Sequence, residues 1–112
     1  MSFADLQKRT DECNAYRSFL LGQIALCDMD MRECERALAA MRAALENRSP
    51  DTAKWRIEGM YNSNDSVNHW FAKLDKAEGV RGLLDAAQES LDKKSYMLSR
   101  EITRRQAEVT MR

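Results

Sequence analysis

The sequence has few residues that interrupt helices and few that build sheets. Only one proline and four glycines occur among 112 residues, and the strand-forming residues are too scattered to make alternating runs. Charged residues make up 32% of the chain, a content typical of helices with solvated faces. The composition therefore predicts an all-α fold, and the length allows one domain.

The chain also lacks an excess of charge and any long apolar run. Lysine plus arginine equals aspartate plus glutamate at 18 each, so we expect no nucleic-acid partner and no attraction to an anionic membrane. No run of apolar residues reaches the roughly 18 needed to cross a bilayer. The first residues lack the basic and apolar regions of a secretory signal. We therefore expect a cytoplasmic protein without membrane insertion.

Residues typical of catalytic or metal sites are scarce as well. His69 is the sole histidine, and the sequence has no phosphate-binding or metalloprotease motif. Cys13, Cys27 and Cys34 are spaced by multiples of seven, which places them about 10.5 Å or more apart along one helix, beyond the roughly 7 Å limit for a disulfide. We interpret them as reduced apolar residues and expect no catalytic residue, cofactor or metal site.

A seven-residue apolar repeat runs through the first half of the chain. One stripe comprises Leu6, Cys13, Leu20, Cys27, Cys34 and Met41, and a second stripe, four residues ahead of it, comprises Ile24, Met31, Leu38 and Leu45. Such a repeat is typical of a helix that packs lengthwise against another helix. We predict a helix over about residues 2–47.

A second long helix is predicted after a polar interruption. The only proline indicates a chain reversal at residues 47–50, with Ser49 as N-cap and Pro50 as the first residue of a short helix that ends near Tyr61. The polar run 62–66 then breaks the chain, and either Ser63 or Asp65 is expected to cap the last helix. The turn and short helix thus cover about residues 48–64, and the last helix about 65–109.

The second long helix also carries an apolar stripe. It comprises Trp70, Ala77, Leu84, Leu91 and Leu98, and Arg81, Gln88 and Ser95 are expected to flank it. The sequence therefore predicts a single domain over residues 1–112, a long antiparallel helical hairpin of coiled-coil type with a short helix at its turn. We predict burial of five seam residues: Leu20, Ile24, Leu38, Leu84 and Leu91.

Several large apolar residues fall outside these stripes. They are Phe19, Leu21, Leu26, Met29, Val80 and Leu83. Their positions would suit a further helix from another molecule. The sequence therefore favours a non-enzymatic protein that binds other proteins. The further helix could belong to a separate client or to a second copy in a four-helix bundle, in which case the chain is a self-assembling structural protein.

The middle of the chain resembles a known family. Trp55-Arg56-Ile57-Glu58-Gly59, set between two long amphipathic helices, resembles the Trp-x-Gly turn of the WXG-type helical-hairpin proteins, although three residues separate Trp55 from Gly59 here. Within that superfamily the chain is most similar to the YwqH-like proteins encoded beside LXG toxins. The resemblance implies an adaptor or chaperone that pairs with the helical LXG domain of a type VII secretion substrate, and export with that partner by a non-Sec route.

The residues expected to contact a partner combine this motif with apolar residues of the two long helices. They are Trp55, Gly59, Phe19, Leu26, Met29, Trp70, Phe71 and Leu83. An alternative interpretation of Trp55 is that it anchors the short middle helix onto the hairpin.

A second resemblance concerns the later part of the chain. Gly59-Met60-Tyr61, followed by a long helix that passes through Leu91-Asp92-Lys93-Lys94-Ser95-Tyr96, is similar to the second half of prefoldin β-type subunits. Membership would imply two strands between the long helices. Residues 62–68 are polar and poor in strand-forming residues, so the sequence favours the WXG-type hairpin over a prefoldin-like chaperone subunit.

Overall fold

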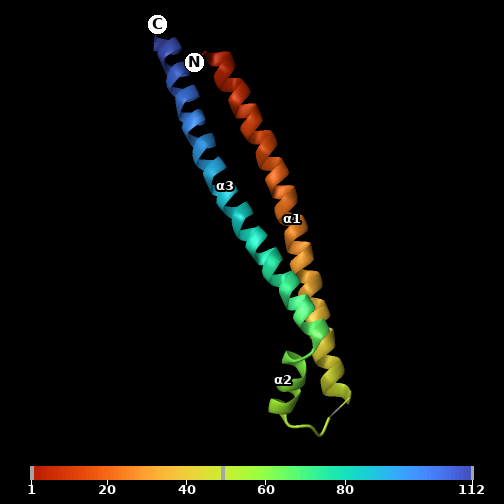
Figure 1. The fold of residues 1–112 in the computed structure, drawn as a ribbon. Helices are drawn as coiled ribbons and strands as arrows, with labels where there is room; N and C mark the ends of the chain where they lie inside the picture. The colour runs from red at the N-terminus through yellow and green to blue at the C-terminus, as the bar shows by residue number, and fades with distance from the viewer. Residues whose placement is uncertain (1, 49, 112) are drawn as a thin grey trace. The chain divides into compact units, whose positions relative to one another are not determined.

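The computed structural model describes residues 2–48 and 50–111, and these residues form three helices. Helix α1 spans Phe3–Arg48, α2 spans Lys54–Asn62 and α3 spans Asp65–Met111 (Figure 1). No strand occurs in this part of the chain, so the strands that a prefoldin-like subunit requires between its long helices are missing. The predicted all-α helical hairpin with a short middle helix is confirmed.

The start of α2 differs from the prediction. Pro50 and Asp51 form a turn, and α2 begins only at Lys54, after Ala53 in an extended conformation with ψ 141°. The assignment of Pro50 as the first helical residue was therefore wrong, because a proline followed by aspartate also suits a turn. The predicted cap at Ser49 lies outside the described residues.

Helix α3 is capped by Asn64, and not by either of the predicted residues, Ser63 or Asp65. The side-chain oxygen of Asn64 accepts hydrogen bonds from the backbone N–H groups of Ser66 at 2.9 Å and Val67 at 3.2 Å. Ser63 instead donates its hydroxyl to the carbonyl oxygen of Gly59, and Asp65 is already the first helical residue. Asparagine is as good an N-cap as serine or aspartate, so sequence preference alone could not separate these neighbours.

The chain divides into two compact units, which share the long helices. The terminal unit joins the described residues 2–24 of α1 to residues 82–111 of α3, and the α2 unit comprises the described residues between 25 and 81. In the terminal unit the two helix segments run antiparallel (Figure 1) and bury Leu6, Leu20, Ile24 and Leu91.

The α2 unit has a small core where all three helices meet. Leu38 of α1, Tyr61 of α2 and Val67 of α3 are buried together. Met41, Leu45, Trp70 and Leu74 pack around them. This cluster attaches α2 to the two long helices.

The predicted seam agrees with the observed burial. Every residue of the two α1 stripes is buried or half-buried, and so is every residue of the α3 stripe. Among the five residues predicted to be buried, only Leu84 remains half-buried. The α1 seam is therefore the face that packs against α3.

Polar residues occupy more of the seam than expected. Arg81, Gln88 and Ser95 are half-buried and belong to a second α3 stripe that begins at Val67, so their assignment to flanking positions was wrong. The Nε atom of Arg81 donates to Asp28 of α1 at 3.0 Å. This cross-helix ion pair satisfies the arginine while its aliphatic stem lies against the seam.

Candidate protein-binding surface

The exposed face of α2 presents a tryptophan beside open space. The Trp55 side chain is 76% exposed, and Met60 is exposed on the same helix. Gly59 follows Trp55 by one helical turn, and a Cβ atom built on Gly59 meets nothing within 4 Å. A partner could therefore approach the backbone of α2 closely while contacting the indole ring.

The opposite face of α2 explains why Trp55 points outward. Ile57 and Tyr61, four residues apart, are buried, and Tyr61 packs with Leu38 of α1 and Val67 of α3. Arg42 of α1 forms a bidentate ion pair with Glu58 through two hydrogen bonds. In one of them Nη2 lies 3.1 Å from Oε2. These contacts orient α2, so the interpretation of Trp55 as the anchor of the middle helix was wrong.

Electrostatic contacts reinforce this orientation. The guanidinium group of Arg42 lies 4.6 Å from the centre of the Tyr61 ring. Its hydrogen bonds to Glu58 lower the pKa of that carboxyl below its ordinary value. One arginine therefore contacts two residues of α2, and α2 presents its exposed face as a fixed surface.

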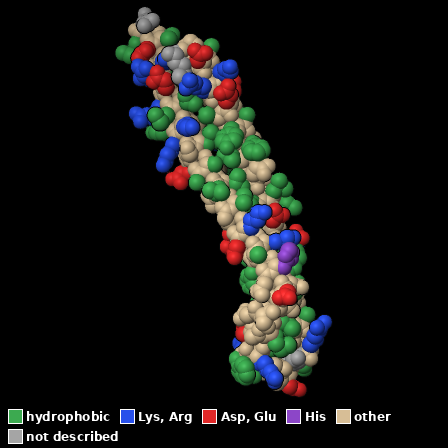
Figure 2. All heavy atoms as spheres, in the orientation of Figure 1, with side chains coloured by type: hydrophobic (Ala, Val, Ile, Leu, Met, Phe, Trp, Pro, Cys, Tyr) green, Lys and Arg blue, Asp and Glu red, His purple; other side chains and the backbone are tan. Residues whose placement is uncertain are grey.

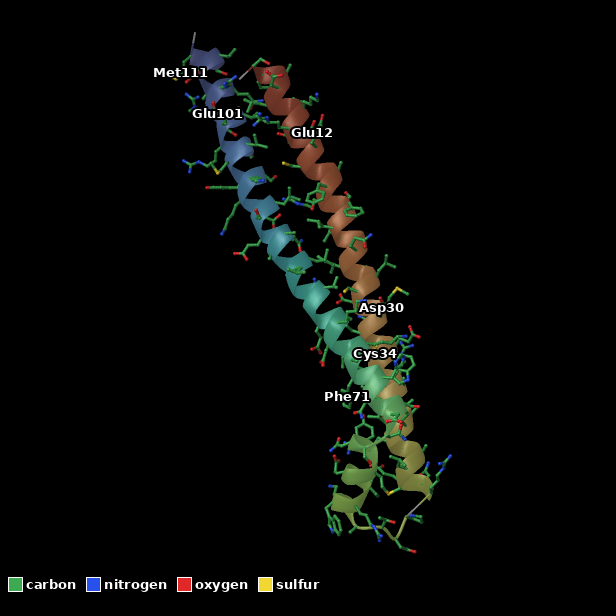
Figure 3. The ribbon with its side chains drawn as sticks, viewed as in Figure 1. Glu12, Asp30, Cys34, Phe71, Glu101 and Met111 are labelled. Atoms are coloured by element: carbon green, nitrogen blue, oxygen red, sulfur yellow. The ribbon has the colours of Figure 1, made fainter. Side chains whose placement is uncertain are left out.

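The two aromatic candidates on α3 lie in different environments. Trp70 is half-buried against the core, and the Lys73 ammonium group lies 4.8 Å from the centre of its ring. Phe71, labelled in Figure 3, is partly exposed. It packs edge-on against Tyr61, with ring centres 5.9 Å apart. Phe71 thus lies beside α2, whereas Trp70 packs against the core.

The remaining candidates are exposed apolar side chains of the long helices. Phe19 and Leu83 belong to the terminal unit, and Leu26 and Met29 to the α2 unit. Figure 2 shows hydrophobic side chains at the surface among charged ones. Sequence reasoning missed Met60, Tyr16, Tyr96 and Met97, which are also exposed. For Tyr16, Tyr96 and Met97, positions in the heptad repeats outside the seam stripes could have identified them, whereas Met60 lies on α2, which has no heptad repeat.

The described residues offer no arrangement for metal chemistry. No group of three His, Cys, Asp or Glu side chains in this part of the chain could hold a metal ion. Cys27 and Cys34 are buried and Cys13 is half-buried, and all three are free thiols, with the Cys27 sulfur 3.3 Å from the carbonyl oxygen of Ala77. None of the described helices has a stretch long and apolar enough to span a bilayer.

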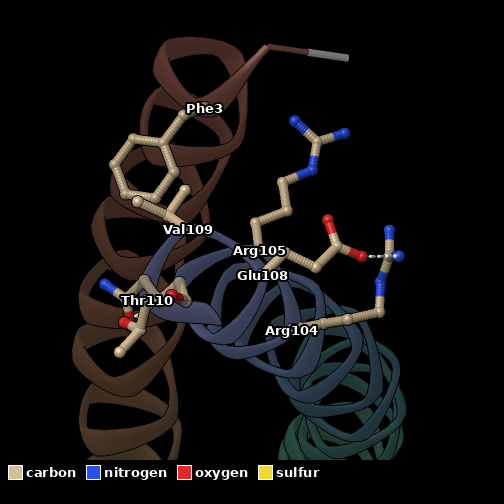
Figure 4. Close-up of a pocket in the computed structure, with 7 residues that line it drawn as sticks. Phe3, Arg104, Arg105, Glu108, Val109 and Thr110 are labelled. Carbon is tan, nitrogen blue, oxygen red and sulfur yellow. Dashed lines mark hydrogen bonds and ion pairs between the residues drawn. The ribbon is translucent and has the colours of Figure 1, made fainter. Parts of the chain in front are cut away.

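A shallow pocket near the helix ends of the terminal unit contains paired charges. Figure 4 shows Phe3 of α1 near Val109 of α3, with Arg104, Arg105 and Glu108 along the rim. Arg104 contacts Glu101 at 2.6 Å and Glu108 at 2.8 Å, and Arg105 contacts Glu101 at 3.1 Å. These arginines are therefore already engaged by carboxylates of their own helix.

The cluster around Glu101 predicts an acid-resistant carboxylate. Hydrogen bonds from Arg104 and Arg105 lower the pKa of Glu101 from 4.5 to about 2. The unfolded chain takes up this proton near pH 4.5 and the folded chain only near pH 2. The stabilisation is therefore complete above pH 4.5 and is lost as the pH falls towards 2. A carbon NMR titration of the Glu101 carboxyl should show this midpoint.

Two variants control this measurement. Combined Arg104→Ala and Arg105→Ala substitution should return the Glu101 pKa towards 4.5, whereas Lys93→Ala, which removes the partner of Glu89, should leave it unchanged. A midpoint near 4.5 in the unmodified protein would contradict the observed ion pairs.

Comparison with known proteins returned no match: no family model, no curated protein and no solved structure is significantly similar to this chain.

Proposed function

We propose that this chain is a non-enzymatic helical binding protein that acts as an adaptor or chaperone for a helical domain of a larger client. The client implied by the sequence resemblance is the LXG-type domain of a type VII secretion substrate. The proposal is supported mainly by the α2 surface, where Trp55 is held in solvent by a buried opposite face and a fixed ion pair.

The physical argument concerns the free energy available at Trp55. A tryptophan side chain can bury roughly 150–250 Å² of surface, and tryptophan is enriched among the residues that dominate binding free energy. Because α2 is already ordered by Ile57, Tyr61 and Arg42, little conformational entropy remains to be lost when a partner covers Trp55. Gly59 leaves room for that partner beside the ring.

Co-expression with a protein that carries an LXG-type helical domain, followed by size-exclusion chromatography and calorimetry, tests the proposal. We expect a stoichiometric complex whose dissociation constant rises about 30-fold on Trp55→Ala, the loss of roughly 2 kcal/mol typical of a dominant interface residue. Tyr96→Ala is the matched control, because Tyr96 is an exposed aromatic residue of the other unit. Equal effects of the two substitutions would contradict the proposal, as would the absence of any complex.

Gly59→Leu separates binding from folding at the same surface. The new side chain enters open space on a helix without a positive φ angle at this position, so it should raise the melting temperature through better helix propensity. It should also obstruct the partner and weaken the complex. A variant that is more stable and binds as well as the unmodified chain would place the partner elsewhere.

A further inference from the structure

A groove between α1 and α3 in the α2 unit has opposite charges on its two rims. Its α1 side is lined by Cys27, Asp30, Glu33 and Cys34, and its α3 side by Trp70, Lys73, Lys76, Ala77 and Val80. Figure 3 marks Asp30 and Cys34 on α1. We call this the lateral groove: its floor is largely apolar, its α1 rim is acidic and its α3 rim is basic.

The rim charges are not neutralised within the chain. Asp30, Glu33, Lys73 and Lys76 are exposed, and none of them takes part in the ion pairs found among residues 2–48 and 50–111. By contrast, Asp28 and Arg81 of the same unit pair at 3.0 Å across the seam. The lateral groove therefore has four charges available to another molecule.

We infer that a second copy of this chain covers the lateral groove, related by a two-fold axis parallel to the helices. This axis lays α1 of each copy over α3 of the other, because a two-fold interface uses the same surface on both partners. Asp30 and Glu33 of each copy then face the lysine rim of the other. Both rims of both copies are neutralised, and the apolar floors, including exposed Val80, are covered.

A single foreign helix satisfies this pattern less readily than a second copy. It would need basic residues along one flank and acidic residues along the other, in register with both rims. This chain already has that arrangement, because its own α1 rim and α3 rim are complementary in charge. Opposite potentials meeting across an interface fix the register of association.

The terminal unit, taken by itself, has a second groove, and the α1 rim of this groove carries charges of both signs. Arg9, Glu12, Cys13 and Tyr16 of α1 and Leu91, Lys94, Met97 and Leu98 of α3 line it. A two-fold axis along these helices places Glu12 opposite Lys94 of the second copy and covers the exposed side chains of Tyr16 and Met97. Because Arg9 adds a positive charge to the same rim, this groove supports apolar contact between two copies but does not repeat the charge pattern of the lateral groove.

Each copy would need to bury roughly 800 Å², the area typical of a specific interface. Trp55 does not line the lateral groove, so this inference goes beyond the proposed client binding and does not depend on it.

Charge-swapped variants of the full chain test the inference. Lys73→Glu with Lys76→Glu makes both rims acidic, and Asp30→Lys with Glu33→Lys makes both rims basic. We expect the unmodified chain to sediment as a dimer at micromolar concentration in analytical ultracentrifugation, and each double variant to dimerise at least 30-fold more weakly. An equimolar mixture of the two variants should restore the dimer as a heterodimer.

Lys54→Glu with Arg56→Glu is the matched control. It changes the net charge by the same amount as the lysine reversal, on exposed positions of the α2 unit that do not line the lateral groove. This control and Trp55→Ala should both remain dimeric, and circular dichroism should show unchanged helix content in all variants. A monomeric unmodified chain would overturn the inference, as would double variants that dimerise normally or a mixture that fails to restore the dimer.

Discussion

Leu38→Asp is expected to unfold the α2 unit and with it most of the cooperative structure. Leu38 is 6% exposed and packs with Tyr61 and Val67 in the core where the three helices meet. Arg42, one helical turn away, is already paired with Glu58, so an aspartate at position 38 would be a buried charge without a free partner. We expect a loss of more than about 4 kcal/mol, a large part of the stability of a typical domain.

Leu26→Asp provides the matched control, because it is the same substitution in the same helix. Leu26 is 55% exposed, so its replacement should cost less than about 1 kcal/mol, mostly through lower helix propensity. Thermal and urea unfolding followed by circular dichroism would measure both. If Leu38→Asp kept the melting temperature of the unmodified chain, the seam would have been placed on the wrong face of α1.

Tyr61→Ala is expected to release α2 from the long helices at a cost of about 3 kcal/mol, as is typical of truncating a buried aromatic side chain. Tyr61 is 5% exposed and contacts the edge of Phe71 and the guanidinium group of Arg42. Its removal leaves a cavity at the meeting point of the three helices. Hydrogen exchange should show lost protection of the amides of α2, with protection retained in the terminal unit.

The control for this substitution is Tyr96→Ala on α3. Tyr96 is 63% exposed, so truncation should change the unfolding free energy by less than about 0.5 kcal/mol. If the two tyrosine variants unfolded alike, or if α2 kept its protection without Tyr61, then Ile57 and the ion pair of Glu58 would suffice to attach this helix.

The sequence alone predicted the long helices and the residues along their seam. Leu6, Leu20, Cys27 and Cys34 recur at heptad spacing, and this periodicity requires only that one face of a helix be buried. The break near residue 63 was predictable for the same local reason, because successive polar residues there favour a turn over a helix. Local preference did not decide which of three neighbouring polar residues became the cap, Asn64.

Only the tertiary structure decided which face of α2 is buried. Trp55, Ile57, Met60 and Tyr61 are all apolar residues on a nine-residue helix, too short for its periodicity to identify one buried face. Packing buried Ile57 and Tyr61, with Tyr61 in contact with Leu38 and Arg42 from elsewhere in the chain, and it left Trp55 in solvent.

The placement of the charged side chains within and beside the seam was also decided by tertiary contacts. Arg81 could be placed only once Asp28, far away in sequence, lay within hydrogen-bonding distance. The opposite rims of the lateral groove likewise arise because α1 and α3 run antiparallel and bring Glu33 and Lys73 to the two sides of one groove. Heptad spacing determines which residues face a neighbouring helix, whereas the pairing of specific charges requires the register between two helices, which spacing within one helix does not contain.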